Sequence, residues 1–170
     1  MLITNTAIPS ADHAAVINIV TYSPKETENI KGLIQVCHGM TEYMERYEDF
    51  SKYFTERGYV VFGNDIISHG RSTTSKTENL YFTDWSYVVE DMSRTRKYVS
   101  RKFPETDIFL LGFSLGSFIV RTADDLSAYK KEILIGNKGI RIYMIFTIIS
   151  RIIQKIIHSF GFNLELLHLI

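Results

Sequence analysis

The ten residues from 108 to 117, IFLLGFSLGS, contain the feature that most limits what this chain can fold into. A short apolar run comes first, then a serine between two glycines, and then residues that suit the start of a helix. Ser114, between Gly112 and Gly116, completes the pattern Gly-x-Ser-x-Gly, in which a sharp strand-to-helix turn exposes the serine hydroxyl. The glycines are needed where strand and helix nearly touch, because a Cβ atom there would collide. The pattern therefore predicts a parallel sheet with Ser114 just beyond one of its strands.

The composition allows a globular domain and disfavours some classes of protein. The chain has 170 residues, the size of one domain or of part of one. Hydrophobic residues make up 45% and charged residues 22%, so the chain can build a core. The 19 basic residues balance the 19 acidic residues, and nothing in this balance predicts a nucleic-acid partner.

The N-terminus and the single cysteine bear on where the protein acts. Residues 1–10 hold no basic segment followed by an apolar run, so we expect no secretory signal. One cysteine, Cys37, excludes a disulfide within the chain and suits a reducing compartment. It stands at the end of a predicted buried strand, where packing is a commoner role than reactivity. We therefore expect a cytoplasmic protein.

Apolar runs alternate with amphipathic stretches along the chain. Apolar runs predict strands at residues 14–22, 32–37, 59–67, 107–113 and 133–135. Apolar residues at helical spacing predict helices at residues 42–57, 84–103 and directly after Ser114. Asp84 suits the N-cap of the second helix and Pro104 its end. This alternation predicts an α/β fold with a mostly parallel sheet, whose first strand is antiparallel and near the edge.

Three polar turns follow three of the predicted strands. They are His38-Gly39, His69-Gly70 and Ser114. Because the carboxyl ends of parallel strands meet at one edge of a sheet, we expect these turns to lie close together. Ligands of such sheets bind beyond that edge. The three turns together therefore favour a functional site around Ser114.

The order and spacing of these motifs resemble those of the α/β-hydrolase superfamily. The resemblance is carried by residues 38–42 (HGMTE), 65–72 (DIISHGRS) and 112–116 (GFSLG), and it extends over roughly residues 14–139. Within the superfamily, the chain looks most like the lysophospholipase and monoacylglycerol-lipase-like serine hydrolases. One departure is Ser68, where that group usually has glycine. Since Ser68 lies in a loop, we expect this departure to matter little.

The resemblance implies a reaction and a set of roles. Ser114 would attack a carboxylic ester, most simply a lysophospholipid or a monoacylglycerol, to form an acyl-enzyme that water then hydrolyses. The backbone N–H groups of Met40 and Leu115 would hold the negative charge on the ester oxygen. Loss of one such donor costs roughly 3–4 kcal/mol in known cases. No metal or organic cofactor is expected, and the expected partner is a lipid-like ester.

A serine hydroxyl needs a base, and the acid and histidine of this fold follow the serine in the chain. Asp124 and Asp125 are expected on the helix that leaves the elbow, pointing away from the site as solvated residues or in surface ion pairs. Glu132 precedes a strand and so lies at the wrong edge of the sheet. Glu165 is the acidic residue that then remains after Ser114.

The histidines leave the base unassigned. His38 and His69 precede Ser114, against the order of the fold, and are expected to brace their loops. His158 is expected on the polar face of a helix, and His168 is two residues from the end. We therefore expect the acid and the base beyond residue 170, in a chain that is truncated. The strand at residues 133–135 would then be an exposed edge, and the polypeptide alone poorly soluble or unstable.

Residues 140–170 differ from the rest in being dense in isoleucine. We expect residues 1–139 to be the N-terminal part of the hydrolase domain and residues 140–170 to be an incomplete, helical, cap-like segment. From residue 145 the apolar residues share one helical stripe. The helix could pack on the domain, cover the acyl chain of a substrate, or lie on a membrane surface as a peripheral contact. A second functional hypothesis is an inactive fragment or degenerate hydrolase, associated with membranes through residues 143–160.

Overall fold

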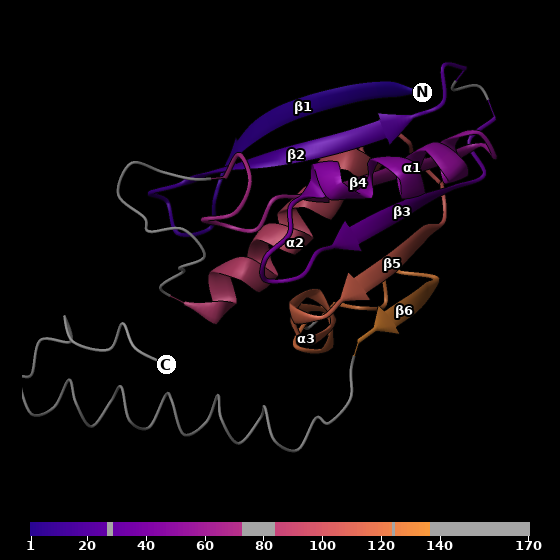
Figure 1. Cartoon of the computed structure of the whole chain (residues 1–170). Helices are drawn as coiled ribbons and strands as arrows, with labels where there is room; N and C mark the ends of the chain where they lie inside the picture. The colour runs from indigo at the N-terminus through magenta and orange to yellow at the C-terminus, as the bar shows by residue number, and fades with distance from the viewer. Residues whose placement is uncertain (27–28, 73–83, 124, 137–170) are drawn as a thin grey trace, which may run out of the picture. The chain divides into compact units, whose positions relative to one another are not determined.

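The computed structural model describes residues 1–26, 29–72, 84–123 and 125–136 (Figure 1). Several sequence predictions fall outside these residues. They are the cap-like segment at residues 140–170 with its helix, the candidates Glu165, His158 and His168, and Asp124.

The described residues form one sheet of six strands in the order β1-β2-β4-β3-β5-β6 (Figure 1). The strands are β1 (Leu2–Pro9), β2 (Val16–Ser23), β3 (Gly32–Cys37), β4 (Tyr59–Asn64), β5 (Ile108–Phe113) and β6 (Lys131–Ile135). The four strands β4, β3, β5 and β6 pair in parallel, and β1 and β2 are added at one side as an antiparallel pair. The prediction of an α/β fold with a mostly parallel sheet is confirmed.

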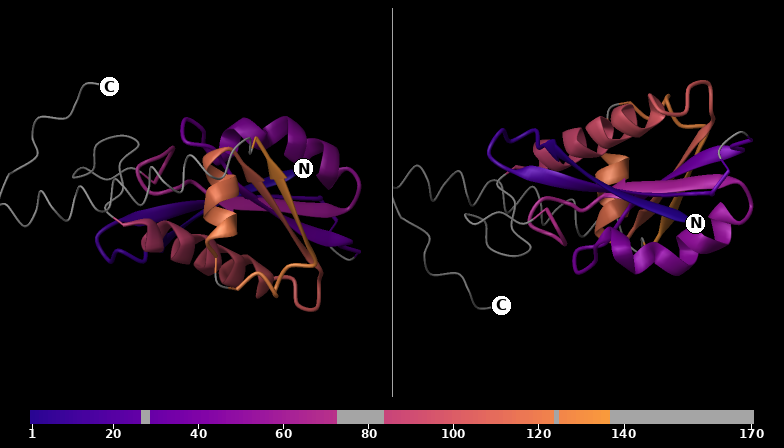
Figure 2. Two further views of the ribbon diagram at one scale, coloured as in Figure 1. Left: turned by 90° about the horizontal axis from the view of Figure 1, so that it is seen from below. Right: turned by 90° about the horizontal axis from the view of Figure 1, so that it is seen from above.

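Helices cover both faces of this sheet, with α1 and α2 on opposite sides (Figure 2). The helical elements are the 3-10 turn η1 (Met44–Tyr47) and the helices α1 (Glu48–Thr55), α2 (Trp85–Ser100) and α3 (Leu115–Arg121). Side chains alternate along each strand, so successive residues pack on opposite faces of the sheet. On one face, Leu33 and Leu110 pack with α2 and α3. On the other face, Ile34 and Leu111 pack with Phe50 of α1. All six residues of β3 are buried, as expected for a central strand covered on both faces.

The two outer strands differ in how well the sequence predicted them. β1 was not predicted, because Leu2–Pro9 mixes polar with apolar residues and is mostly exposed. Its presence places β2 one strand in from the edge, although β2 is antiparallel as expected. At the other side β6 is the outermost strand of the described residues, and Ile133 and Ile135 are 56% and 46% exposed.

The helix α2 is bonded to the turn between the antiparallel strands β1 and β2. Its predicted cap is confirmed, since Asp84 Oδ1 accepts the Ser86 N–H at 2.8 Å. Farther along, the buried carboxylate of Asp91 accepts the Ser10 hydroxyl and the Ala11 N–H, both at 2.7 Å. These two bonds hold the turn between β1 and β2 against α2. Burial raises the pKa of Asp91 from 3.8 to about 6.

Candidate active site

The turn between β5 and α3 holds Ser114 in a conformation that side chains rarely adopt. Its φ and ψ are 49° and −114°, its side chain is exposed, and its N–H donates to the Ile135 carbonyl at 2.9 Å. A Cβ atom on Gly116 would lie 1.9 Å from the Cys37 carbonyl oxygen, and one on Gly112 would lie 2.9 Å from the Gly116 carbonyl oxygen. The chain therefore needs glycine at both positions to bring β3, β5 and α3 this close.

The loop after β3 lies directly against this turn. A Cβ atom on Gly39 would be 3.4 Å from the Cβ atom of Ser114. Met40, the next residue, is 54% exposed, and Leu115 is the first residue of α3. The expected nucleophile and the two expected N–H donors thus come from adjacent segments at one edge of the sheet, and their catalytic roles remain predictions.

His38 is a fully buried brace between two loops. Its Nε2 atom accepts the Ile66 N–H at 2.9 Å, and so its Nδ1 atom carries the proton and donates to the Gly39 carbonyl at 2.7 Å. Burial lowers the pKa of His38 to about 4, with a smaller effect from the neighbouring His69. The ring is therefore neutral near pH 7 and has no nitrogen left with which to accept a proton from Ser114.

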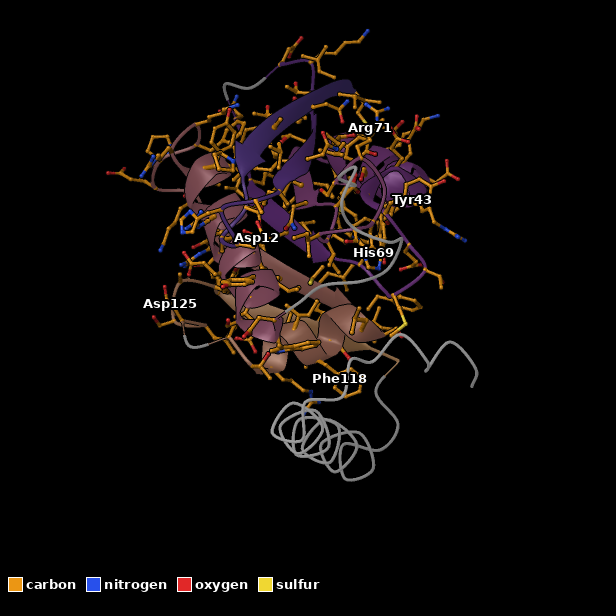
Figure 3. The ribbon with its side chains drawn as sticks, turned by 90° about the vertical axis from the view of Figure 1, so that its left-hand side faces the viewer. Asp12, Tyr43, His69, Arg71, Phe118 and Asp125 are labelled. Atoms are coloured by element: carbon orange, nitrogen blue, oxygen red, sulfur yellow. The ribbon has the colours of Figure 1, made fainter. Side chains whose placement is uncertain are left out.

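His69 is buried like His38, but only one of its two ring nitrogens has a hydrogen-bond partner among the described residues. Its ring lies 5.4 Å from the ring of His38, between centroids, and its Nδ1 atom is 3.0 Å from the Ile67 carbonyl oxygen. Its Nε2 atom has no hydrogen-bond partner within the described part of the chain. Figure 3 shows His69 on the same side of the molecule as Tyr43 and Arg71. Among the described residues, no histidine hydrogen-bonds to Ser114.

Asp65, the first residue of the motif at residues 65–72, anchors the loop after β4. It is 1% exposed. Its Oδ1 atom accepts the Met44 N–H at 2.7 Å, and its Oδ2 atom accepts the Arg71 N–H at 2.9 Å and the Asn18 Nδ2 at 3.2 Å. Gly70, at φ +50°, leaves room for this carboxylate, because a Cβ atom there would be 2.5 Å from Oδ2. The one sequence signal for this role was the aspartate that opens the motif at residues 65–72.

Glu42, the last residue of the motif at residues 38–42, holds the loop after β3. Its N–H donates to the Gly39 carbonyl at 3.2 Å, and its Oε2 atom accepts the Gly39 N–H at 2.9 Å and the Tyr47 hydroxyl at 2.8 Å. These contacts fold the loop back on itself, so α1 begins at Glu48, after the turn η1, and the prediction of one helix from residue 42 is corrected. The fixed spacing of residues 38 and 42 in HGMTE was the available signal.

Ser68, which replaces the usual glycine, has an unfavourable backbone conformation and a buried hydroxyl, so the expectation that this departure matters little is not supported. Its φ is +66°, in the left-handed region that favours glycine. Its side chain is 1% exposed, and the hydroxyl oxygen has no hydrogen-bond partner among the described residues. The residue therefore combines a strained backbone with a buried polar atom that lost its bonds to water.

Asp125, Glu132 and Cys37 are the remaining residues that the sequence singled out among those described. The exposed Asp125 pairs with the buried Arg96, with 2.7 Å between Oδ2 and Nη2, so only the acid of this ion pair is at the surface. The helix α3 ends at Arg121, and Asp125 lies beyond it, not on the helix as expected. Glu132 is exposed on β6. Burial raises the pKa of the Cys37 thiol to about 12, so this side chain packs as a neutral thiol. Within the described ranges, no cluster of three or more histidine, cysteine or acidic side chains could hold a metal ion.

Comparison with known proteins places the chain in a family. A family model described as serine aminopeptidase, S33, matches residues 28–150. The chain belongs to this family. The match begins just before β3 and includes the segments with His38, His69 and Ser114.

Curated relatives and a solved structure agree with this assignment. The chain is 33% identical over 89 residues to a monoglyceride lipase of Rattus norvegicus and 32% identical over 95 residues to one of Homo sapiens. These matches cover 52% and 56% of this chain, but only 28% and 30% of the relatives. A carboxyl esterase from Bacillus coagulans superposes with a TM-score of 0.77 at 24% identity, over 91% of this chain and 51% of that one. The structure therefore has the α/β-hydrolase fold, and its matches span less than a third of the curated relatives.

Proposed function

We propose that this chain is a serine hydrolase of carboxylic esters that uses Ser114 as its nucleophile. The observation that carries the proposal is the exposed Ser114 at φ 49°, next to the Gly39–Met40 loop. Strain of this kind is kept at functional sites, where it holds a group in a reactive orientation. The family match and the similarity to monoglyceride lipases support the same reaction class.

The chemistry follows from which groups lie at this edge. The Ser114 hydroxyl oxygen would attack the ester carbonyl carbon, and the alcohol would leave with a proton as the acyl-enzyme forms. Water would then release the fatty acid and restore the hydroxyl. The charge on the carbonyl oxygen would be held by the N–H groups of Met40 and Leu115, which stabilise it most when they are fixed before the reaction.

We propose a monoacylglycerol or a lysophospholipid as the substrate. The relatives that support this are named monoglyceride lipases, whereas the family itself is described as an aminopeptidase family. One fold can carry several such activities, so the substrate has to be measured. Contact with a membrane surface also remains a proposal, since it was based on residues 140–170. None of the helices within the described ranges is long and apolar enough to cross a bilayer.

A second candidate is a chain whose serine is not activated. The described residues favour it in one respect, because both nitrogens of His38 are engaged and His69 is nearly fully buried. Neither histidine is arranged as a base for Ser114. In this case the chain would keep the fold and the elbow without the reaction.

Labelling with a fluorophosphonate probe separates the two candidates. The probe modifies only a serine whose hydroxyl is activated, and mass spectrometry of the peptides identifies the modified residue. We expect one label on Ser114 of the wild-type chain and none on S114A. S127A, which removes an exposed hydroxyl away from the elbow, should label like the wild type. A wild-type chain that takes up no probe would support the inert candidate.

Substrate class is then tested with the labelling-competent protein. Hydrolysis of a monoacylglycerol, a lysophosphatidylcholine and an aminoacyl p-nitroanilide is compared at equal concentration. We expect the two esters to be cleaved and the anilide to be left intact. Cleavage of the anilide alone would replace the ester proposal with a peptidase.

A further inference from the structure

The direction of the Met40 N–H group is determined by the carbonyl group of Gly39. The two belong to the same peptide unit, which is planar, and none of the described peptide bonds is cis. The N–H therefore points opposite to the carbonyl. Whatever holds the Gly39 carbonyl therefore also aims the Met40 N–H, in the loop that packs against Ser114.

Hydrogen bonds hold the peptide units on both sides of Gly39. After it, the Gly39 carbonyl accepts the His38 Nδ1–H at 2.7 Å and the Glu42 N–H at 3.2 Å. Before it, the Gly39 N–H donates to Glu42 Oε2 at 2.9 Å. Gly39 has no side chain to restrict its φ and ψ, so these three bonds replace the restriction that a Cβ atom would give.

Tyr47 completes the arrangement from the far side of Glu42. Its hydroxyl donates to the same Oε2 atom at 2.8 Å, and its ring packs edge-on against Phe50 of α1, with 6.4 Å between centroids. Burial and the bond to Glu42 raise the pKa of Tyr47, so the hydroxyl keeps its proton and remains a donor. The carboxylate of Glu42 is thus held between the loop and the start of α1.

We propose that Glu42, held by Tyr47, is a positioning residue that fixes the direction of the Met40 N–H group in the loop that packs against Ser114. Two observations set Glu42 apart from the surface acids around it. It contacts Gly39 through both its backbone and its side chain, and its carboxylate accepts two hydrogen bonds and forms no ion pair with any of the described residues. The proposed function enters only in the consequence, which is faster acylation of Ser114. An oxyanion donor stabilises the transition state most when it is aimed in advance.

The geometric part is tested by NMR on the full chain labelled with ¹⁵N. Residual dipolar couplings report the direction of the Met40 N–H, and hydrogen exchange reports the protection of the Gly39 N–H. The variants are E42A, which removes the carboxylate, E42Q, which keeps one acceptor oxygen, and Y47F, which removes only the donor to Glu42. E48A is the matched control, because Glu48 is an exposed glutamate at the start of α1.

In E42A we expect the Gly39 N–H to exchange roughly tenfold faster, because a charge-assisted hydrogen bond is lost, and the Met40 coupling to change. Y47F should give a smaller change in the same direction, and E42Q should retain part of the protection. E48A should match the wild type. Exchange of the Ile34 N–H in β3 should be unchanged in all four, which shows that the sheet is intact. Wild-type exchange and coupling in E42A would overturn the proposal.

The functional part is tested by the rate of Ser114 labelling. With increasing probe concentration, E42A should lower the maximal rate of labelling roughly tenfold and leave the half-saturating concentration unchanged, because the donor acts on the transition state. A loss through general destabilisation would appear in E42A as faster exchange throughout β3. If the wild type does not label, the proposed function fails, while the NMR measurements still decide whether Glu42 directs the loop. If the wild type labels and E42A labels equally fast, the positioning role fails alone.

Discussion

The loops after β3 and β4 each contain a buried histidine followed by a glycine, and yet they are stabilised in different ways. In the loop after β3, both ring nitrogens of His38 and both peptide units around Gly39 have partners. In the loop after β4, the Nε2 atom of His69 and the hydroxyl of Ser68 lack partners within the described residues, and Ser68 has a positive φ. The second loop is instead held mainly by the Asp65 carboxylate.

This difference shows that a repeated dipeptide does not imply a repeated role. The His38 loop carries the N–H group expected to act in catalysis, and its hydrogen bonds hold that group in place. The loop after β4, which contains His69, contacts the loop after β3, because the Ile66 N–H at its start donates to His38. Substitutions that destabilise the loop after β4 should therefore also destabilise the loop after β3. Removal of His69 Nε2 or of the Ser68 hydroxyl should change the free energy of unfolding only a little.

The largest effect is expected from the anchor of the second loop. In D65N, an amide nitrogen replaces one carboxylate oxygen and faces an N–H donor, either that of Met44 or that of Arg71. We expect a loss of about 4 kcal/mol in the free energy of unfolding, measured by urea denaturation. D12N is the control: Asp12 caps a turn through one oxygen, which an amide keeps, and its change should stay below about 0.5 kcal/mol. Equal stability of D65N and the wild type would show that the loop does not depend on this carboxylate.

The same substitution in the two histidines compares the loops directly. H38F leaves the Ile66 N–H without a partner in the core, so we expect a loss of about 3 kcal/mol in the free energy of unfolding. H69F removes one hydrogen bond, to the Ile67 carbonyl, and also removes an unpartnered nitrogen, so its cost should be below about 1 kcal/mol. Urea denaturation of both variants at pH 7 gives the difference. Similar losses of unfolding free energy in H38F and H69F would mean that the two loops do not differ in how far they depend on the hydrogen bonds of their histidines.

The dependence of stability on pH provides a third comparison, between His38 and Asp91 of α2. The pKa of His38 falls from 6.5 unfolded to about 4 folded, so its contribution is complete above pH 6.5 and is lost as the pH drops toward 4. The pKa of Asp91 rises from 3.8 to about 6, so its contribution is complete below pH 3.8 and is lost as the pH rises through 6. Each difference corresponds to about 3 kcal/mol. Between pH 4 and 6 the two should nearly cancel in the wild type.

Variants of the two groups uncover the opposing slopes. In D91N, the amide still accepts the Ala11 N–H and donates to the Ser10 hydroxyl, so the fold is kept while one titration disappears. Its free energy of unfolding should fall steadily from pH 6.5 to 4. H38F should show the reverse slope, with stability rising as the pH falls. Parallel curves for D91N and the wild type would contradict the assignment of this titration to Asp91.

The elements that the sequence predicted well are those set by local pattern and by packing in the core. The six residues of β3, the cap of α2 at Asp84 and the parallel strand β6 follow from apolar runs and capping chemistry. β1 could not be predicted in this way, because an exposed edge strand with polar residues such as Thr4 and Asn5 has neither signal. Its position depends on pairing with β2 and on the distant carboxylate of Asp91.

The start of α1 and the roles of the acids around the site depended on contacts between segments far apart in sequence. The turn η1 precedes the helix because Met44 donates its N–H to Asp65, 21 residues farther along the chain. Glu42 likewise bends back to Gly39 instead of opening a helix. The sequence placed His38, Gly39 and Ser114 at one edge correctly, because parallel strands make that edge predictable. It could not show which neighbours hold them.

The smallest expected effect is the change in unfolding free energy on substitution of Ser68. Whether the substitution stabilises or destabilises the chain is the informative result. S68G should stabilise the chain by about 1 kcal/mol, because glycine adopts φ +66° without strain and carries no buried hydroxyl. S68A removes the hydroxyl but keeps the Cβ atom in the left-handed region, so the difference between the two variants measures the backbone strain less the conformational entropy that glycine adds to the unfolded chain. If S68A already gives the full gain in the urea midpoint, the hydroxyl is the main cost and the strain does not exceed the entropy that glycine adds to the unfolded chain. If both variants are less stable than the wild type, the Ser68 side chain contributes contacts that outweigh both costs, and the loop after β4 is as well satisfied as the loop after β3.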